Sequence, residues 1–241
     1  MRTLVGYELR DSIATITMDD GKMNVLSPDM FAQLNAAFDR AAQDRRVVVL
    51  AGREGVFSAG FDLRTLGAGG ADAHAMVRMG FELAERVLSF PAPVVVACGG
   101  HALAMGVFLV LAGDYRVGAL GPFRIGANEV AIGITMPFFG VEICRQRLSP
   151  AHFHRAVINA EIYGPEDAVA AGFLDRVVPA ADLHEAARAA AADLGKLDAG
   201  VHAASKLRAR RHALQAVRAA IEADDAAFRT LFGLPEAAAA L

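Results

Sequence analysis

Two glycine-containing segments of this sequence contain residues that could do chemistry together. Residues 57–63 (FSAGFDL) and residues 99–106 (GGHALAMG) each follow a short apolar run that is typical of a buried strand. Each segment then leads into a polar or helical stretch, which leaves backbone N–H groups without partners at the turn. Two such donors that converge on one carbonyl oxygen stabilise its negative charge. The pair therefore indicates chemistry that passes through an enolate.

Glu129 is the carboxylate that could serve such chemistry. It lies in residues 126–134 (GANEVAIGI), an otherwise apolar stretch in which an ionised side chain loses solvation. These surroundings raise the pKa of a carboxyl group toward neutrality, where it can accept and return protons. An ordinary carboxylate at the start of a helix has the same local pattern. Glu129 becomes a candidate base when the three segments are read together.

Composition indicates a soluble α/β enzyme and excludes some other classes. The chain has 241 residues, enough for one large domain or for a core with a small appendage. Its formal net charge of −3 gives no general affinity for nucleic acid or for an anionic membrane. The only cysteines, Cys98 and Cys144, lie in apolar patterns, so we expect two buried thiols and no disulfide.

Several motifs are missing from the sequence. It has no phosphate-binding Gly-x-x-x-x-Gly-Lys-Ser/Thr motif and no Gly-x-Gly-x-x-Gly after the first strand, which disfavours nucleotide hydrolysis and dinucleotide binding. The seven histidines show no metal-binding pattern, so no metal is expected. No signal peptide or membrane-spanning segment is recognisable, and we expect a cytoplasmic location and no membrane partner.

Strand and helix patterns alternate in the first half of the chain. A hairpin is predicted at residues 7–18, with its turn at Asp11 and Ser12. The apolar runs at residues 47–51 and 93–98 are typical of strands buried on both faces. We therefore predict parallel strands joined by helical crossovers. Other predicted elements are a helix capped by Ser27, helices at 71–90 and 105–112, and a strand at 114–119.

The second half is predicted to be mostly helical. The expected helices cover residues 150–158, 165–172, 181–194 and 201–228, with a brief strand at 173–178 and a frayed alanine tail after Pro235. We place a soft boundary near residue 185. It separates a core at residues 1–185 from a C-terminal helical region at residues 186–241.

In order, residues 57–63, 100–106 and 128–133 resemble the crotonase family, the enoyl-CoA hydratase and isomerase superfamily. The resemblance covers most of the chain, from the hairpin to the strand at 173–178. It implies an α/β fold, a crotonase-like spiral of ββα turns with a helical C-terminal portion. It also implies an acyl-CoA thioester as substrate, no separate cofactor because coenzyme A is part of that substrate, and a homotrimer or dimer of trimers joined through residues 186–241.

The resemblance assigns the oxyanion hole to the backbone N–H groups of Phe61 and Met105. Family members usually have glycine where this sequence has Met105, because glycine allows the backbone to approach a ligand closely. The donor is a main-chain group and is therefore kept. The flexible thioether, however, is expected to crowd and reshape the acyl site.

A second departure concerns the reaction itself. Hydratases of this family hold water between two glutamates, and by spacing these positions fall on Phe108 and Glu129. Phenylalanine neither binds nor deprotonates water, so one carboxylate remains. A 1,3-proton shift needs only one base. The sequence therefore resembles the 3,2-enoyl-CoA isomerase branch, with Glu129 moving a proton from C2 to C4 of a 3-enoyl-CoA.

The resemblance also implies contacts with coenzyme A and with the acyl chain. Lys22 would approach the CoA phosphates, and Ala59 and Gly60 would present backbone groups to adenine and pantetheine. The other implied contacts are Val25, Asp62, Leu63, Gly106 and three candidates for the wall of the acyl pocket, Phe108, Phe138 and Phe139. Structural roles compete with these: Lys22 as a solvated loop residue, Asp62 as a helix cap, and the phenylalanines as plain core. The basic run at residues 206–211 fits a solvated helix face better than a 3′-phosphate contact.

Two alternatives to the isomerase remain at this point. One is an enoyl-CoA hydratase, a lyase of fatty acid degradation, that uses groups the sequence does not reveal. The other is a non-catalytic acyl-CoA-binding member of the family, which Met105 and Phe108 make conceivable and Glu129 opposes.

Overall fold

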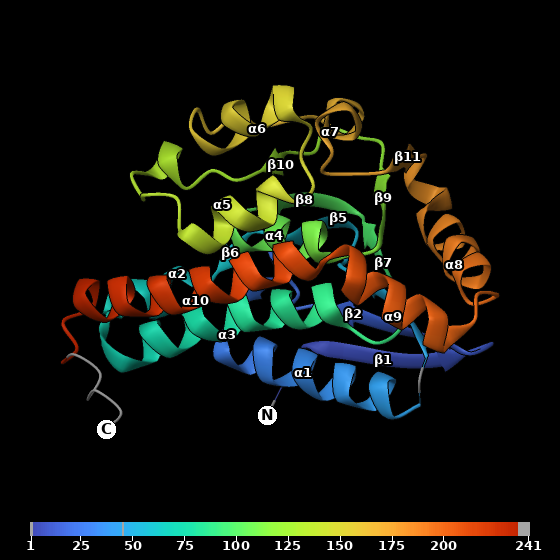
Figure 1. Cartoon of the computed structure of the whole chain (residues 1–241). Coiled ribbons are helices and arrows are strands. Elements are labelled where there is room, and N and C mark those ends of the chain that lie inside the picture. The colour runs from blue at the N-terminus through green and yellow to red at the C-terminus, as the bar shows by residue number, and fades with distance from the viewer. Residues whose placement is uncertain (1, 45, 236–241) are drawn as a thin grey trace.

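The computed structural model describes residues 2–44 and 46–235, and its main feature is a six-stranded sheet (Figure 1). The strand order is β1-β2-β4-β7-β9-β11, in which β1 and β2 are antiparallel and the other pairs are parallel. The strands are β1 (Val5–Arg10), β2 (Ile13–Met18), β4 (Val47–Ala51), β7 (Val94–Cys98), β9 (Tyr115–Ala119) and β11 (Arg176–Val178). The predicted hairpin and the predicted parallel strands are both confirmed.

Short strands build two smaller sheets beside the main one. They are β5 (Gly55–Ser58), β8 (Gly100–Leu103) and β10 (Ile125–Gly126) in one sheet, and β3 (Val25–Leu26) and β6 (Gly60–Phe61) in the other. A main-sheet strand, a strand of a smaller sheet and a helix therefore follow one another repeatedly along the chain. This is the expected spiral of ββα turns, although the short strands themselves were not predicted.

Helices surround the sheets and form the C-terminal portion. The first group is α1 (Pro28–Gln43), α2 (Leu63–Ala68), α3 (Gly70–Ser89), α4 (Met105–Ala112), η1 (Val130–Ile132) and α5 (Phe138–Arg145). The second group is α6 (Pro150–Val157), α7 (Pro165–Ala171), η2 (Ala180–Asp182), α8 (Leu183–Leu194), α9 (Ala199–Ala209) and α10 (Arg211–Leu231). Among the residues that the structure describes, no helix combines the length and the apolar character needed to cross a membrane.

Local signals explain several helix ends and buried residues. The Ser27 side chain accepts a hydrogen bond from the Met30 N–H at 3.2 Å, and Pro28 occupies the first turn, so the predicted cap of α1 is confirmed. Both cysteines are buried and free, as predicted. The strand expected at 173–178 is shorter, because Phe173 and Leu174 belong to the turn after α7 and pack into the core.

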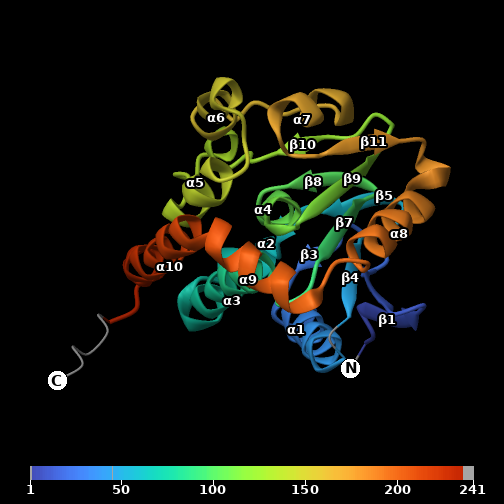
Figure 2. The same cartoon turned by 45° about the vertical axis from the view of Figure 1, so that its right-hand side comes forward.

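The C-terminal helices pack on two parts of the molecule. Helix α8, in which residue 185 lies, packs against β4, β7 and β9 of the main sheet (Figure 2). Helix α10 runs beside α3 and also packs against α5 (Figure 1). The prediction of a single helix at 201–228 is wrong, because the helix is interrupted at Arg210, between α9 and α10.

The basic run at residues 206–211 is not a solvated face throughout. Lys206 is only 7% exposed, and its Nζ lies 2.6 Å from Oδ2 of Asp114. The Arg210 guanidinium lies 2.9 Å from the other carboxylate oxygen and donates to the Leu88 carbonyl at 2.7 Å. These contacts hold the chain where α9 ends. For these two side chains, both the solvated interpretation and the phosphate interpretation are wrong.

Candidate active site

The Phe61 N–H is left without a sheet partner by the short β3–β6 pairing. Asp62 donates its N–H to the Leu26 carbonyl of β3 at 3.3 Å. Because successive N–H groups of a strand point to opposite sides, the Phe61 N–H points away from β3. Asp62 also caps α2, since its Oδ1 accepts from the Arg64 N–H at 3.1 Å, which confirms its predicted structural role.

The Met105 N–H has no acceptor within α4, because Met105 is the first residue of that helix. The first N–H groups of a helix have no acceptor within that helix. Ala104, immediately before it, has a φ of 49° and a ψ of −130°, an uncommon conformation for a residue with a Cβ atom. The chain thus turns sharply from β8 into α4, and Met105 carries its N–H at this turn. Its side chain is buried in the core.

Close contacts bring these two donor segments together. Gly60 has a φ of 93°, and a methyl group on it would lie 2.9 Å from the Cβ atom of Ala104 and 3.3 Å from the Met105 nitrogen. A methyl group on Gly106 would lie 2.4 Å from the Ser58 carbonyl oxygen. Glycine at both positions therefore allows the segments to pack backbone against backbone. The Met105 nitrogen lies next to Gly60, and Phe61 follows directly in the chain.

Glu129 is a buried carboxyl group with a free oxygen. Only 6% of the residue is exposed, and its Oε2 has no hydrogen-bond partner among the described residues. Burial raises the pKa of Glu129 to about 7, while a hydrogen bond from its own backbone N–H opposes the shift. Buried polar atoms in folded proteins nearly always have partners, so this orphaned oxygen makes Glu129 a candidate functional residue.

The second carboxylate of a hydratase is replaced by hydrophobic packing. Phe108 is buried, and its ring lies edge-on to that of Phe139 with the centroids 5.8 Å apart. The titratable neighbour of Glu129 is Cys144, whose thiol pKa is raised by burial and by the charge of Glu129. Within the described part of the chain, no other carboxylate contributes to the pKa of Glu129. The described geometry therefore supplies one acid-base group.

Aromatic rings from α5, α10 and the Phe61 segment pack around Phe81 of α3. Phe81 of α3 stacks on Phe139 of α5 with centroids 4.4 Å apart, and it lies 6.1 Å from Phe61 and 6.3 Å from Phe228 of α10. Sequence reasoning missed Phe81 and Phe228 because both lie in ordinary amphipathic helices. Phe138, expected as a pocket wall, is 60% exposed, and the adjacent Phe139 takes the interior position.

The remaining predicted contacts lie around the Phe61 donor, at the surface or half-buried. Lys22 is exposed, and its loop is held by its own N–H, which donates to Asp20 Oδ1 at 2.7 Å. Val25 and Ala59 are half-buried, and Ala59 donates its N–H to the Met23 carbonyl at 3.0 Å. Leu63 is exposed. These residues border the donor segment, and their contact with coenzyme A stays a prediction.

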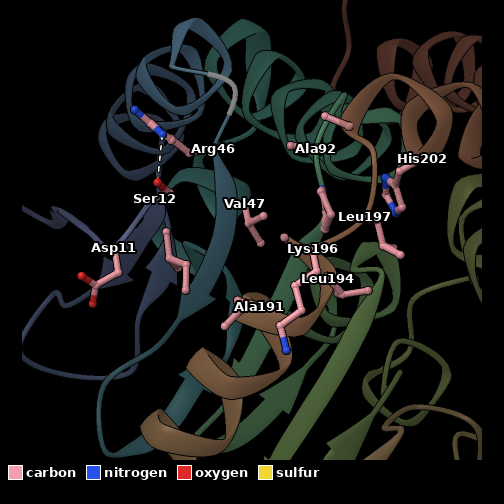
Figure 3. Close-up of a pocket in the computed structure, with 15 residues that line it drawn as sticks. Asp11, Ser12, Arg46, Val47, Ala92, Ala191, Leu194, Lys196, Leu197 and His202 are labelled. Atoms are coloured by element: carbon pink, nitrogen blue, oxygen red, sulfur yellow. Dashed lines mark hydrogen bonds between the residues drawn. The ribbon is translucent and has the colours of Figure 1, made fainter.

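A separate cavity lies at the end of the main sheet where strands β4 and β7 begin (Figure 3). Its volume is about 260 Å³, and it is lined by the beginnings of β4 and β7, the end of α8 and the connection to α9. Met105 and Glu129 instead come after β8 and β10 of the three-stranded sheet, and Phe61 is the last residue of β6; all three lie in segments that follow the carboxyl ends of main-sheet strands. In open α/β sheets ligands bind at those carboxyl ends, so the cavity is not part of the candidate active site. No cluster of three or more metal-ligating side chains occurs in residues 2–44 and 46–235.

Comparison with known proteins agrees with this arrangement. The family model described as enoyl-CoA hydratase/isomerase matches residues 8–236. A crystal structure of the enoyl-CoA isomerase of Mycobacterium tuberculosis without ligand is 47% identical, with a TM-score of 0.87 over 91% of this chain and 96% of that one. The enoyl-CoA hydratase EchA3 of Mycobacterium ulcerans is 46% identical, with a TM-score of 0.91 over 94% and 100% of the two chains.

A curated relative carries the hydratase name. The probable enoyl-CoA hydratase EchA17 of Mycobacterium tuberculosis is 30% identical over 182 residues, which is 73% of this chain and 69% of the relative. Names of both enzymes thus occur among similar proteins. The match over nearly the whole sequence, the spiral of ββα turns and the convergent donor segments lead to one conclusion: the chain belongs to the enoyl-CoA hydratase/isomerase family.

Proposed function

We propose that this protein isomerises 3-enoyl-CoA to 2-enoyl-CoA. The observation that carries the proposal is a buried carboxyl group without a partner: among the described residues Glu129 has a free oxygen and a pKa of about 7, and the other expected glutamate position is the buried Phe108. Hydration requires that water is activated and that a proton is delivered, whereas isomerisation requires one base that releases the proton again.

In the proposed reaction, the Glu129 carboxylate removes a proton from C2 of the 3-enoyl thioester. The electron pair of the broken C–H bond spreads over the carbonyl and the adjacent double bond as a dienolate. The Phe61 and Met105 N–H groups donate hydrogen bonds to the dienolate oxygen and stabilise its charge. Protonated Glu129 then returns the proton to C4, and the double bond moves from C3–C4 to C2–C3. No water is consumed.

Other parts of the proposal concern binding. Lys22 would contact the CoA phosphates, and the backbone near Ala59 and Gly60 would contact adenine and pantetheine. The aromatic group around Phe81 and Phe139 offers the apolar surface that an acyl chain needs. Assembly as a homotrimer or a dimer of trimers, through the C-terminal helices, belongs to the same proposal.

The test uses purified protein with 3-hexenoyl-CoA and, separately, 2-hexenoyl-CoA. We expect the first to be converted into the conjugated 2-enoyl thioester, which ultraviolet absorbance follows, and mass spectrometry to find no added water. Rapid hydration of 2-hexenoyl-CoA would identify a hydratase and overturn the proposal. Tight binding of both thioesters without turnover would identify a non-catalytic acyl-CoA-binding protein instead.

Gly60→Ala should damage the proposed oxyanion hole. A left-handed backbone costs a residue with a Cβ atom about 1–2 kcal/mol, and the new methyl group meets Ala104 at 2.9 Å. Because small displacements of catalytic groups can slow a reaction about 10²-fold, we expect kcat to fall by about that factor. Gly55→Ala is the matched control, since Gly55 has a φ of 81° and open space around the added methyl. Equal rates in both variants would contradict this assignment.

A further inference from the structure

Helix α5 is capped by a side chain from the far end of the sequence. The residue before α5 is Pro137, which has no side-chain acceptor for the first N–H groups of the helix. Instead, Asp224 of α10 accepts from the Phe138 N–H at 3.0 Å through Oδ1 and from the Phe139 N–H at 2.8 Å through Oδ2. Asp224 is only 3% exposed. The two helices are thus joined by a buried carboxylate at a helix N-terminus.

The charged groups that surround this contact have other partners. On α3, the side chains of His74 and Arg78 pair with Asp225, the residue after Asp224, at 3.1 and 2.9 Å. On α10 itself, Arg229 also pairs with Asp225 at 3.2 Å. On α5, Glu142 and Arg145 pair with each other. Burial raises the pKa of Asp224, and the bonds from Phe138 and Phe139 oppose the shift. The Asp224 carboxylate is therefore stabilised by the N-terminal end of α5.

Helix α5 also lies near Glu129. Cys144, in the last turn of α5, is close enough for the charge of Glu129 to raise the pKa of its thiol. Near the other end of the helix, Phe139 packs against Phe108 and Phe81. Gly140 makes room for the Phe108 ring, which would lie 2.9 Å from a methyl group at this position. Helix α5 is therefore held by α10 at its first residues, and its last turn lies near Glu129.

We propose that Asp224 is a positioning residue through which the C-terminal helix α10 holds α5 over Glu129 and keeps water away from the base. Without the cap, two N–H groups and the dipole of α5 lose their acceptor, and the contact between α5 and α10 weakens. Water then reaches the Glu129 carboxyl and solvates its charged form. The role of this shielding in turnover rests on the proposed isomerase function, whereas the shielding itself does not.

The experiment measures the proton affinity of Glu129 directly. Carbon-13 NMR of glutamate labelled at the side-chain carboxyl is recorded over a pH series, and Glu129→Gln assigns the signal. In Asp224→Ala we expect the pKa of Glu129 to fall by about one unit or more toward its ordinary value. Asp224→Asn keeps one acceptor and should give a smaller fall. Asp225→Ala is the matched control, because it removes contacts with α3 and leaves the α5 cap intact.

A merely structural role for Asp224 predicts something different. Folded Asp224 variants would then be less stable but would titrate Glu129 as the wild-type protein does, and that result would overturn the proposal. An equal fall in Asp225→Ala would also overturn it. If Asp224→Ala does not fold, the pKa of Glu129 in Asp224→Asn decides between the positioning role and the merely structural role. A shifted pKa in a protein that isomerises no thioester would refute the proposed reaction and leave the positioning role intact.

Discussion

Glu129→Gln is expected to remove the isomerase activity and to make the folded protein more stable at the same pH. Glutamine has nearly the shape of glutamate but cannot accept the C2 proton. General base catalysis typically contributes about 10²–10⁴-fold to a rate, and we expect kcat to fall by a factor in that range. Turnover of 3-hexenoyl-CoA measures the loss. An unchanged rate would show that Glu129 is not the base.

The gain in stability follows from the pKa of Glu129. Folding raises this pKa from 4.5 to about 7, so the folded state holds the proton more tightly than the unfolded state. Stability therefore falls as pH rises from about 4.5 through about 7, by about 3 kcal/mol in total. Glutamine carries no charge and avoids this loss.

The stability gain is tested by urea unfolding at two pH values. At pH ~8 the Glu129→Gln variant should unfold with a free energy about 3 kcal/mol larger than the wild type, and at pH ~4 the two should agree. Glu54→Gln is the control, because Glu54 is exposed and should show no such difference. A gain of the same size at both pH values would contradict the electrostatic explanation.

Asp114→Ala is expected to destabilise the protein by about 3–5 kcal/mol, because it leaves two buried cations without their counter-ion. The Asp114 carboxylate contacts Nζ of Lys206 at 2.6 Å and the Arg210 guanidinium at 2.9 Å, and it accepts from the Val94 N–H at 2.7 Å. Burial lowers the pKa of Lys206, and the negative charge of Asp114 opposes that lowering. Denaturant unfolding at neutral pH measures the change.

Two further variants separate this effect from an ordinary loss of an ion pair. Asp193→Ala removes an exposed pair with Lys196, and we expect it to change stability far less than Asp114→Ala does. Adding Lys206→Met to Asp114→Ala should recover part of the lost stability, because one uncompensated charge disappears. A loss below about 1 kcal/mol in Asp114→Ala would mean that the ion pairs of Asp114 contribute little to holding α9.

The sequence by itself determined those features that depend on neighbouring residues. The hairpin at β1 and β2, the buried strands, the Ser27 and Asp62 caps and the buried cysteines all follow from periodicity or from short hydrogen bonds. The raised pKa of Glu129 was predictable for the same reason, since its apolar neighbours in sequence are part of what desolvates it. The ordered motifs were enough to indicate the family.

Only the tertiary structure decided how distant segments meet. The short strands have too few residues to show a period, and they exist because β5, β8 and β10 pair in one sheet and β3 and β6 in another. Whether Phe138 or Phe139 points inward depends on how α5 is docked. Asp224, Lys206 and Arg210 look like ordinary surface charges in a helical sequence. Their partners lie roughly 85 to 120 residues away, and no local pattern reports a contact over that separation.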